Sequence, residues 1–209
     1  MKILNLYAGI GGNRKLWGDE HEITAVEYDK EIADIYKHYF PNDNVIIGDA
    51  HQFILDNHRD YDFIWSSPPC PTHSRFNYLL QNIPEKYEKK YPEMELYQEI
   101  IYLKHFFKGH WVVENVISYY DPLIKPQKSN NHYFWANFNI PVFEKDNRGI
   151  RGNKNNLKYK QERNGFYVED FKISSAKKRK ILNNCVLPEL GKAILDELSG
   201  HRIQEVSKS

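Results

Sequence analysis

Short apolar runs alternate with amphipathic stretches along most of this chain. The apolar runs have strand length, and several are apolar at successive positions, as expected for strands buried on both faces. Strands that alternate with helices favour a largely parallel sheet with helices packed on it. Strands are expected at residues 2–7, 23–27, 45–50, 62–65, 111–113 and 132–138. Helices are expected at residues 29–40, 51–58, 94–107 and 187–198, and the tail from Gly200 is expected to fray.

Two segments depart from this alternation. Residues 71–92 are polar and contain three prolines, which predicts a long loop, and loops of this length commonly act as lids. Residues 144–180 contain twelve basic and five acidic residues interleaved with Asn and Tyr. This composition favours contact with phosphates and base edges, and a solvated, poorly ordered insertion is the alternative.

A glycine-rich turn, Ala8-Gly9-Ile10-Gly11-Gly12, follows the first expected strand. A strand, a glycine turn and a helix open many nucleotide-binding units. Arg14 stands where the dinucleotide fingerprint needs a third glycine, and no Lys-Ser/Thr pair follows the turn. NAD, FAD and P-loop ligands are therefore disfavoured, and a purely structural turn remains open.

Acidic residues close three of the expected strands. Glu27 ends the second strand, where an acid commonly accepts hydrogen bonds from ribose hydroxyls. Asp49 ends the third strand and suits an adenine amine. Glu114 follows the fifth strand. The alternatives are helix caps or solvated acids, and for Asp49 in particular a cap of the helix at 51–58.

A cysteine follows the fourth strand in the segment Ser67-Pro68-Pro69-Cys70. Proline cannot donate to a sheet ladder, so the strand must stop near Pro68. Cys70 is then expected at the carboxyl edge of the sheet, where α/β proteins bind their ligands. The stiff Pro-Pro pair would hold the thiol as a positioned nucleophile, whereas a buried structural cysteine is the plainer interpretation.

These segments, in this order, resemble the motifs of DNA cytosine carbon-5 methyltransferases. The matching segments are Asn5 to Gly12, the acids Glu27 and Asp49, Ser67-Pro68-Pro69-Cys70 with Ser74, and Glu114-Asn115-Val116. A looser match, Asn183-Asn184-Cys185-Val186, is similar to the last motif, whose helix folds back toward the cofactor. The resemblance implies an α/β, Rossmann-like class I methyltransferase fold dependent on S-adenosylmethionine, with a small basic insertion. Residues 1–143 and 181–200 would form the catalytic domain, and residues 144–180 a short target-recognition or DNA-contact segment.

The resemblance also implies roles for individual residues. Cys70 would be the thiolate that attacks carbon 6 of cytosine, and Glu114 would hydrogen-bond the ring nitrogen and the exocyclic amine. The implied cofactor-binding residues are Tyr7, Ala8, Gly9, Gly11, Gly12, Glu27, Tyr28, Asp49, Ala50, Pro68, Asn184 and Val186. The implied substrate-binding residues are Ser67, Pro69, Ser74, Asn115, Val116, Arg148 and Arg151.

The chain departs from the family pattern at two places. Pro71 stands where the family usually has glutamine after the cysteine. The Gln-x-Arg-x-Arg motif appears as residues 127–131 with both arginines replaced, a loss for which His132 or a nearby lysine can compensate. The short recognition segment implies limited sequence reading, a second subunit, or a compact viral-type enzyme.

The expected function is methylation of cytosine in double-stranded DNA, as in restriction–modification. Two alternatives remain open: a weak or inactive DNA-binding subunit that needs a partner chain, and an RNA cytosine methyltransferase. Hydrolysis by Cys70 with His73 is disfavoured because no oxyanion-hole pattern accompanies the pair. Two cysteines, a formal charge of +1 and the absence of a long apolar run predict a cytoplasmic protein that uses neither membrane nor metal.

Overall fold

The computed structural model describes residues 1–80, 83, 88, 90–143 and 156–206. In this part of the chain, seven strands form one sheet in the order β3-β2-β1-β4-β5-β7-β6. Strands β1 to β5 pair in parallel, and β7 runs antiparallel to both β5 and β6. The strands are β1 (Lys2–Leu6), β2 (Glu22–Glu27), β3 (Asn44–Ile47), β4 (Phe63–Ser66), β5 (His110–Val116), β6 (Gln127–Ser129) and β7 (His132–Ala136). The strand order confirms the predicted Rossmann-like class I methyltransferase fold.

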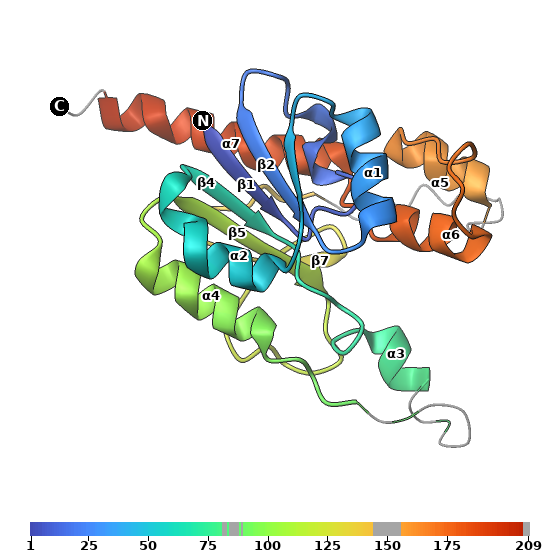
Figure 1. Ribbon diagram of the computed structural model, residues 1–209. Helices are drawn as coiled ribbons and strands as arrows, with labels where there is room; N and C mark the ends of the chain where they lie inside the picture. The colour runs from blue at the N-terminus through green and yellow to red at the C-terminus, as the bar shows by residue number, and fades with distance from the viewer. Residues whose placement is uncertain (81–82, 84–87, 89, 144–155, 207–209) are drawn as a thin grey trace.

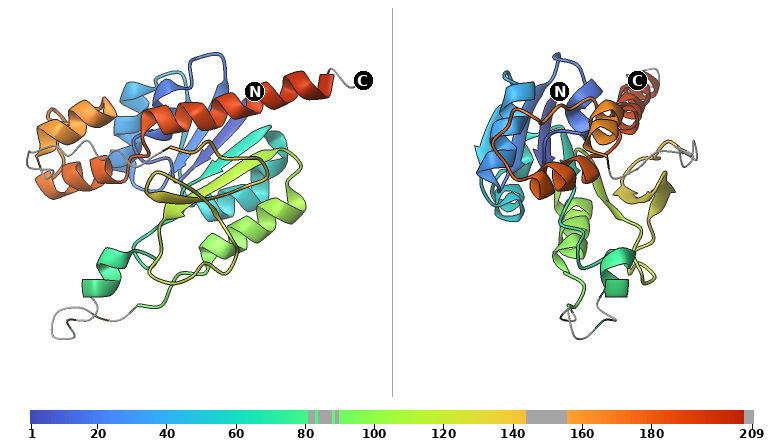
Figure 2. Two further views of the ribbon diagram at one scale, coloured as in Figure 1. Left: turned by 180° about the vertical axis from the view of Figure 1, so that it is seen from behind. Right: turned by 90° about the vertical axis from the view of Figure 1, so that its right-hand side faces the viewer.

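Helices cover both faces of the sheet (Figures 1 and 2). Helices α2 and α4 lie on one face, and α1 and α7 lie on the other. The α-helices are α1 (Lys30–Tyr39), α2 (Ala50–Asn57), α3 (Arg75–Leu80), α4 (Glu95–Phe106), α5 (Leu157–Asn164), α6 (Ser175–Asn183) and α7 (Pro188–Val206). Short 3-10 turns span Asn13–Leu16 and His58–Asp60.

The core follows from the alternation of side chains along each strand. Successive residues of a strand point to opposite faces, so a strand covered on both faces must be apolar throughout. In β4, Phe63 packs in the cluster that contains Leu190 of α7, whereas Ile64 packs in the cluster that contains Leu103 of α4. All four side chains are fully buried. This is why the apolar runs of the sequence predicted the strands well.

The structure differs from the sequence prediction in three segments outside the basic segment 144–180. Helix α3 occupies part of the expected 71–92 loop and stands away from the body of the protein (Figure 1). Strand β6 was not predicted, because its three residues are Gln, Lys and Ser. Helix α7 continues to Val206, so the expected fraying from Gly200 is wrong.

Helices α5 and α6 lie within the basic segment 144–180 or at its end. Between them, Phe166 and Val168 are fully buried in a cluster with Ile35 of α1. The described part of this segment therefore contributes to the core, beyond any contact with nucleic acid. No helix of the described residues is long and apolar enough to cross a membrane.

Candidate active site

The candidate residues meet at the carboxyl edge of the parallel sheet. Strand β4 lies between β1 and β5, with Ser66 paired to Leu6 on one side and to Val113 on the other. The segment after β4, which carries Cys70, therefore emerges between the glycine turn and Glu114. The topology brings the predicted nucleophile and the predicted acid to adjacent strand ends.

Asn115 fixes the segment that carries the cysteine. Its Nδ2 donates to the carbonyl oxygen of Pro68 at 3.0 Å, and its Oδ1 accepts from the backbone N–H of Val116 at 2.9 Å. On the other side, the N–H of Ser67 donates to the carbonyl oxygen of Leu6 at 3.3 Å. The segment is thus tied to both neighbouring strands.

A tight turn follows the cysteine. The backbone N–H groups of His73 and Ser74 both donate to the carbonyl oxygen of Cys70, each at 3.1 Å. The ring Nδ1 of His73 lies 2.6 Å from the hydroxyl of Tyr120, and burial lowers the pKa of this histidine. Tyr120 therefore engages Nδ1 of His73, whereas Nε2 of this ring is buried without a hydrogen-bond partner in the described structure.

The thiol of Cys70 is a weak acid in the resting protein. Burial raises its pKa, and the charge of Glu114 raises the pKa further. The charge of Lys180 on α6 acts in the opposite direction. Lys180 is exposed, so α6 contributes an accessible cation within electrostatic reach of the thiol. The sequence analysis did not single out this lysine for the site.

Glu114 faces a histidine across the sheet. The side chain is 7% exposed, and its Oε1 lies 3.5 Å from Nε2 of His132 at the start of β7. The antiparallel pairing of β5 with β7 creates this proximity, because Val116 pairs with His132. Within the described structure, Nδ1 of His132 is buried without a hydrogen-bond partner. His132 therefore lies against Glu114, directly after the segment in which both family arginines are replaced, and its compensation for them stays a prediction.

The glycine turn presents open backbone beside an anchored carboxylate. Gly9 has a left-handed φ of +56°, and no atom lies within 4 Å of the position that a Cβ would take. Its N–H donates to Oε2 of Glu27 at 2.9 Å, and the N–H of Asp29 donates to Oε1 at 2.9 Å. Glu27 is therefore held in place while its remaining lone pairs can accept ligand hydroxyls.

The segment after α6 returns to this turn. A Cβ on Gly12 would lie 2.7 Å from the carbonyl oxygen of Val186 and 2.9 Å from Cβ of Cys185, so only glycine allows this close packing. Val186 is buried and Asn184 is exposed. The loosest of the sequence matches thus lies against the glycine turn.

Three further candidates, Tyr28, Asp49 and Ala50, lie just after β2 and β3. Asp49 is the N-cap of α2, where its Oδ1 accepts from the N–H of His51 at 2.8 Å and of Gln52 at 3.1 Å. The capping alternative is therefore correct, and a contact with adenine stays a prediction. Ala50 opens the helix and is buried, whereas Tyr28 is 80% exposed beside Glu27.

Sequence reasoning missed a buried carboxylate beneath the site. Glu99 of α4 is 1% exposed and accepts hydrogen bonds from the hydroxyls of Tyr7 and Ser66, each at 2.5 Å. The Nδ1 atom of His51 lies 3.2 Å away. Burial and the Glu99 charge raise the pKa of Tyr7, so this hydroxyl remains a donor. Glu99 thereby joins the glycine turn, the end of β4 and the first turn of α2.

The helical pattern offered a signal for Glu99. It lies three residues after Leu96 and four before Leu103, so it shares their buried face. An acid on such a face must be hydrogen-bonded, because an unpaired buried carboxylate is very costly. Its partners could not be identified from sequence, since they come from three other elements.

Residues 1–122 match the family profile of the C-5 cytosine-specific DNA methylases. The chain belongs to this family. Its members take the methyl group from S-adenosylmethionine, which is therefore the cofactor.

Three similar proteins illustrate what this chain resembles. Over 90 residues, it is 34% identical to a tRNA (cytosine(38)-C(5))-methyltransferase of Spodoptera frugiperda, covering 40% of this chain and 27% of that protein. A solved methyltransferase of Entamoeba histolytica, EhMeth, is 12% identical, with a TM-score of 0.45 over 70% of this chain and 57% of its own. A variant of DNMT2 from Spodoptera frugiperda is 22% identical, with a TM-score of 0.43 over 69% of this chain and 53% of its own. The chain thus spans between about a quarter and somewhat over a half of the length of these relatives.

The carboxyl edge of the sheet suits S-adenosylmethionine. The cofactor has no phosphate, and the glycine turn lacks the lysine that a phosphate site would use. The open space at Gly9 admits a ligand against the backbone, and Glu27 is anchored beside it. Tyr28, directly after β2, and Ile47, the last residue of β3, are exposed by 80% and 52%.

The structure groups the predicted substrate residues as follows. Ser67, Pro69 and Ser74 lie on the segment around Cys70, and Asn115 and Val116 lie at the end of β5. Arg148 and Arg151 lie outside the described residues. No group of His, Cys, Asp and Glu side chains in the described part of the chain could hold a metal ion.

Proposed function

We propose that this methylase transfers a methyl group to carbon 5 of cytosine in nucleic acid, through a covalent adduct between the base and Cys70. The observation that carries the proposal is the adjacency of Cys70 and Glu114. Cys70 follows β4, Glu114 lies near the carboxyl end of the neighbouring parallel strand β5, and the charge of Glu114 raises the pKa of the thiol. A nucleophile and an acid in this arrangement can attack a heteroaromatic ring and stabilise the charge that develops.

The first step is addition of the Cys70 thiolate to carbon 6 of the base. A new S–C bond forms, and the electron pair of the C5–C6 double bond moves to make carbon 5 nucleophilic. Glu114 hydrogen-bonds the ring nitrogen, where negative charge collects, and accepts a hydrogen bond from the exocyclic amine. His132 faces Glu114 and orients its carboxylate. The raised pKa of Cys70 means that the thiol must lose its proton as the base arrives.

The later steps restore the ring. Carbon 5 takes the methyl group, a base removes the proton from carbon 5, and the C5–C6 double bond re-forms as the Cys70 thiolate leaves. S-adenosylmethionine supplies an electrophilic methyl group when bound. The residues that we assign to hold it are the turn at Gly9 and Gly11, the carboxylate of Glu27, and Tyr28.

Two polymers, DNA and RNA, are candidates for the substrate that carries the cytosine. The family is one of DNA methylases, which supports DNA as the first candidate. The relative with 34% identity is a tRNA methyltransferase, which supports RNA as the second. In a duplex, the base must leave the stack, at a cost of a few kcal/mol, before Cys70 can reach carbon 6.

Three wider assignments stay predictions. They are a second subunit, a restriction–modification role and a DNA contact by residues 144–180. Cys70 and Cys185 are both free thiols, which is consistent with the reducing compartment that we propose, the cytoplasm.

A labelled-methyl assay tests the proposal. The purified chain would be mixed with S-adenosylmethionine carrying a tritiated methyl group and, in separate reactions, with mixed-sequence duplex DNA and with tRNA. Cys70→Ala is the matched control, because it removes the nucleophile and leaves the cofactor edge intact. Label on carbon 5 of cytosine with the native chain alone supports the proposal. Equal labelling by the control excludes Cys70 from the mechanism.

A further inference from the structure

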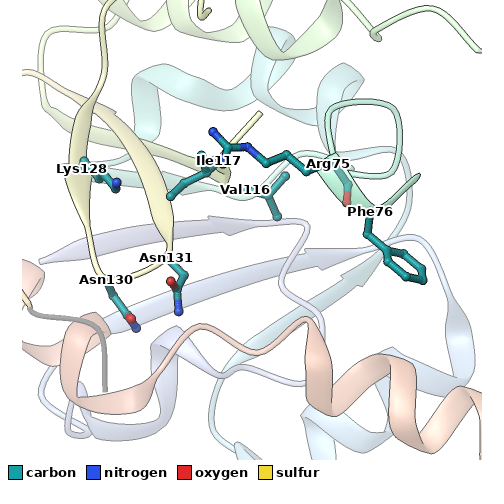
Figure 3. A pocket seen from close by; sticks show the side chains of 8 residues that line it. Arg75, Phe76, Val116, Ile117, Lys128, Asn130 and Asn131 are labelled. Atoms are coloured by element: carbon teal, nitrogen blue, oxygen red, sulfur yellow. The ribbon is translucent and has the colours of Figure 1, made fainter. Parts of the chain in front are cut away.

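A pocket of about 460 Å³ opens beside the catalytic segment. Figure 3 shows it between the start of α3, the end of β5 and the turn between β6 and β7. It contains neither Cys70 nor Glu114. Its lining residues are Ser74, Arg75, Phe76, Val116, Ile117, Lys128, Asn130 and Asn131.

The pocket adjoins the reactive centre through two of these residues. The N–H of Ser74 donates to the carbonyl oxygen of Cys70 at 3.1 Å, and Val116 lies two residues after Glu114. A ligand in the pocket therefore lies next to a base held between the thiol and the acid. It lies away from the glycine turn, which is on the opposite side of β4.

Two cations from different elements line this pocket. Arg75 opens α3, and its Nε donates to the carbonyl oxygen of Ser118 at 3.0 Å, which fixes the guanidinium. Lys128 is exposed on β6, on the other wall (Figure 3). Among the described residues that line the pocket none is acidic. The chain as a whole has a formal charge of only +1, so this positive character is local.

The remaining walls offer amides and an aromatic ring. Asn130 occupies a left-handed position (φ 52°) in the turn between β6 and β7, and its N–H donates to the carbonyl oxygen of Phe143 at 2.7 Å. The turn that presents Asn130 and Asn131 is therefore fixed. Phe76 is 68% exposed at the other side of the pocket. Exposed aromatic rings beside cations are the usual platform for unpaired bases.

We propose that this pocket binds the nucleotide next to the target cytosine, in an unpaired or opened strand. Arg75 and Lys128 hold its phosphodiester, the two asparagines contact base edges, and Phe76 stacks on the base. The assignment rests on the proposed function for the identity of the neighbouring base. It deepens that function, because it assigns the sequence-independent contacts to the phosphodiester to two residues in the described part of the chain, Arg75 and Lys128.

Salt-dependent binding of a fluorescein-labelled twelve-nucleotide single strand, measured by anisotropy, tests this proposal. One arm uses DNA and the other uses RNA of the same sequence. Each phosphate contact contributes about 0.7 to the slope of log affinity against log salt for single strands. Lys128→Gln and Arg75→Gln are each expected to lower that slope by about 0.7 on the polymer that binds. Phe76→Ala is expected to weaken binding roughly fivefold or more and to leave the slope unchanged.

Lys192→Gln is the matched control. Lys192 lies on α7 and pairs with Asp196 far from the pocket, so the slope should equal that of the native chain. Lys128 is the decisive position, because it is exposed and its replacement should not disturb folding, whereas Arg75 also holds Ser118.

The outcomes separate this proposal from the proposed function. An unchanged slope in both charge variants, or no binding of either strand, overturns the pocket assignment even if methyl transfer occurs. A reduced slope supports the pocket assignment even if the native chain transfers no methyl group, in which case only the proposed function fails.

Discussion

Asn115 donates a hydrogen bond to the carbonyl oxygen of Pro68 at 3.0 Å, and this bond joins the strand that carries Glu114 to the segment that carries Cys70. Both partners are buried. The distance between the thiol and the acid therefore depends on a side chain that need not touch the substrate.

Asn115→Ala is expected to slow methyl transfer by roughly 100-fold, because small misplacements of a nucleophile cost this much. It should also lower the free energy of unfolding by about 1–3 kcal/mol, since the Pro68 carbonyl loses its donor. Cofactor affinity should stay near that of the native chain. Single-turnover kinetics and urea denaturation measure both effects. Asn139→Ala, on an exposed residue, is the control, and a native rate in Asn115→Ala would contradict this role.

Glu99→Ala is expected to weaken S-adenosylmethionine binding and to lower the free energy of unfolding by about 3 kcal/mol. The hydroxyls of Tyr7 and Ser66 would lose their common acceptor. Glu99→Gln keeps one acceptor oxygen, so its cofactor affinity and its free energy of unfolding should lie between those of the native chain and those of Glu99→Ala. Titration calorimetry and chemical denaturation measure the changes, with Gln98→Ala on the exposed side of α4 as control. Native cofactor affinity in both Glu99 variants would show that the carboxylate does not position Tyr7.

The reactivity of Cys70 should depend on its two charged neighbours. Because burial and Glu114 raise the pKa of Cys70, alkylation by iodoacetamide should reach half its maximal rate at a higher pH than for an ordinary cysteine. Glu114→Gln should shift this midpoint down, and Lys180→Gln should shift it up. Burial raises the pKa of Cys185 to about 12, so that thiol is the slow internal reference. A Cys70 midpoint that moves in neither variant would contradict the electrostatic account.

His51 should make stability depend on pH. Its hydrogen bond with Glu99 raises the pKa of His51 above the value in the unfolded chain, about 6.5. The stabilisation is therefore fully present below that unfolded pKa and is lost as the pH rises through the folded pKa. The difference in unfolding free energy between the native chain and His51→Gln should be larger at pH 6 than at pH 9. Denaturation at the two pH values measures it, and a larger difference at pH 9 would reverse the assignment.

Much of the edge of the sheet could be predicted from sequence because strand ends are local features. Cys70 and Glu114 each follow an apolar run, and parallel strands bring such ends together whatever lies between them. The prolines before Cys70 marked the end of β4 for a simple reason, the lack of a backbone donor.

The contacts that complete the site could not be predicted in the same way. The partners of Glu99 are Tyr7 just after β1, Ser66 of β4 and His51 of α2, and the close packing of Gly12 on Val186 joins residues far apart in the chain. Strand β6 is too short and polar to give a strand signal. The two short helices on either side of Phe166 could not be predicted from the basic segment. Charged residues dominate its composition, whereas a few apolar residues determine its packing.

The most direct test of the mechanism is a covalent trap. An oligonucleotide with 5-fluorocytosine as its only cytosine would be incubated with the native chain and S-adenosylmethionine. Fluorine cannot leave carbon 5 as a cation, so the final elimination is blocked and the adduct persists. Denaturing electrophoresis and mass spectrometry should then find the oligonucleotide attached to Cys70, only when the cofactor is present, and should find no adduct with Cys70→Ala. Methylation of ordinary cytosine with no trapped adduct on Cys70 would contradict the covalent mechanism.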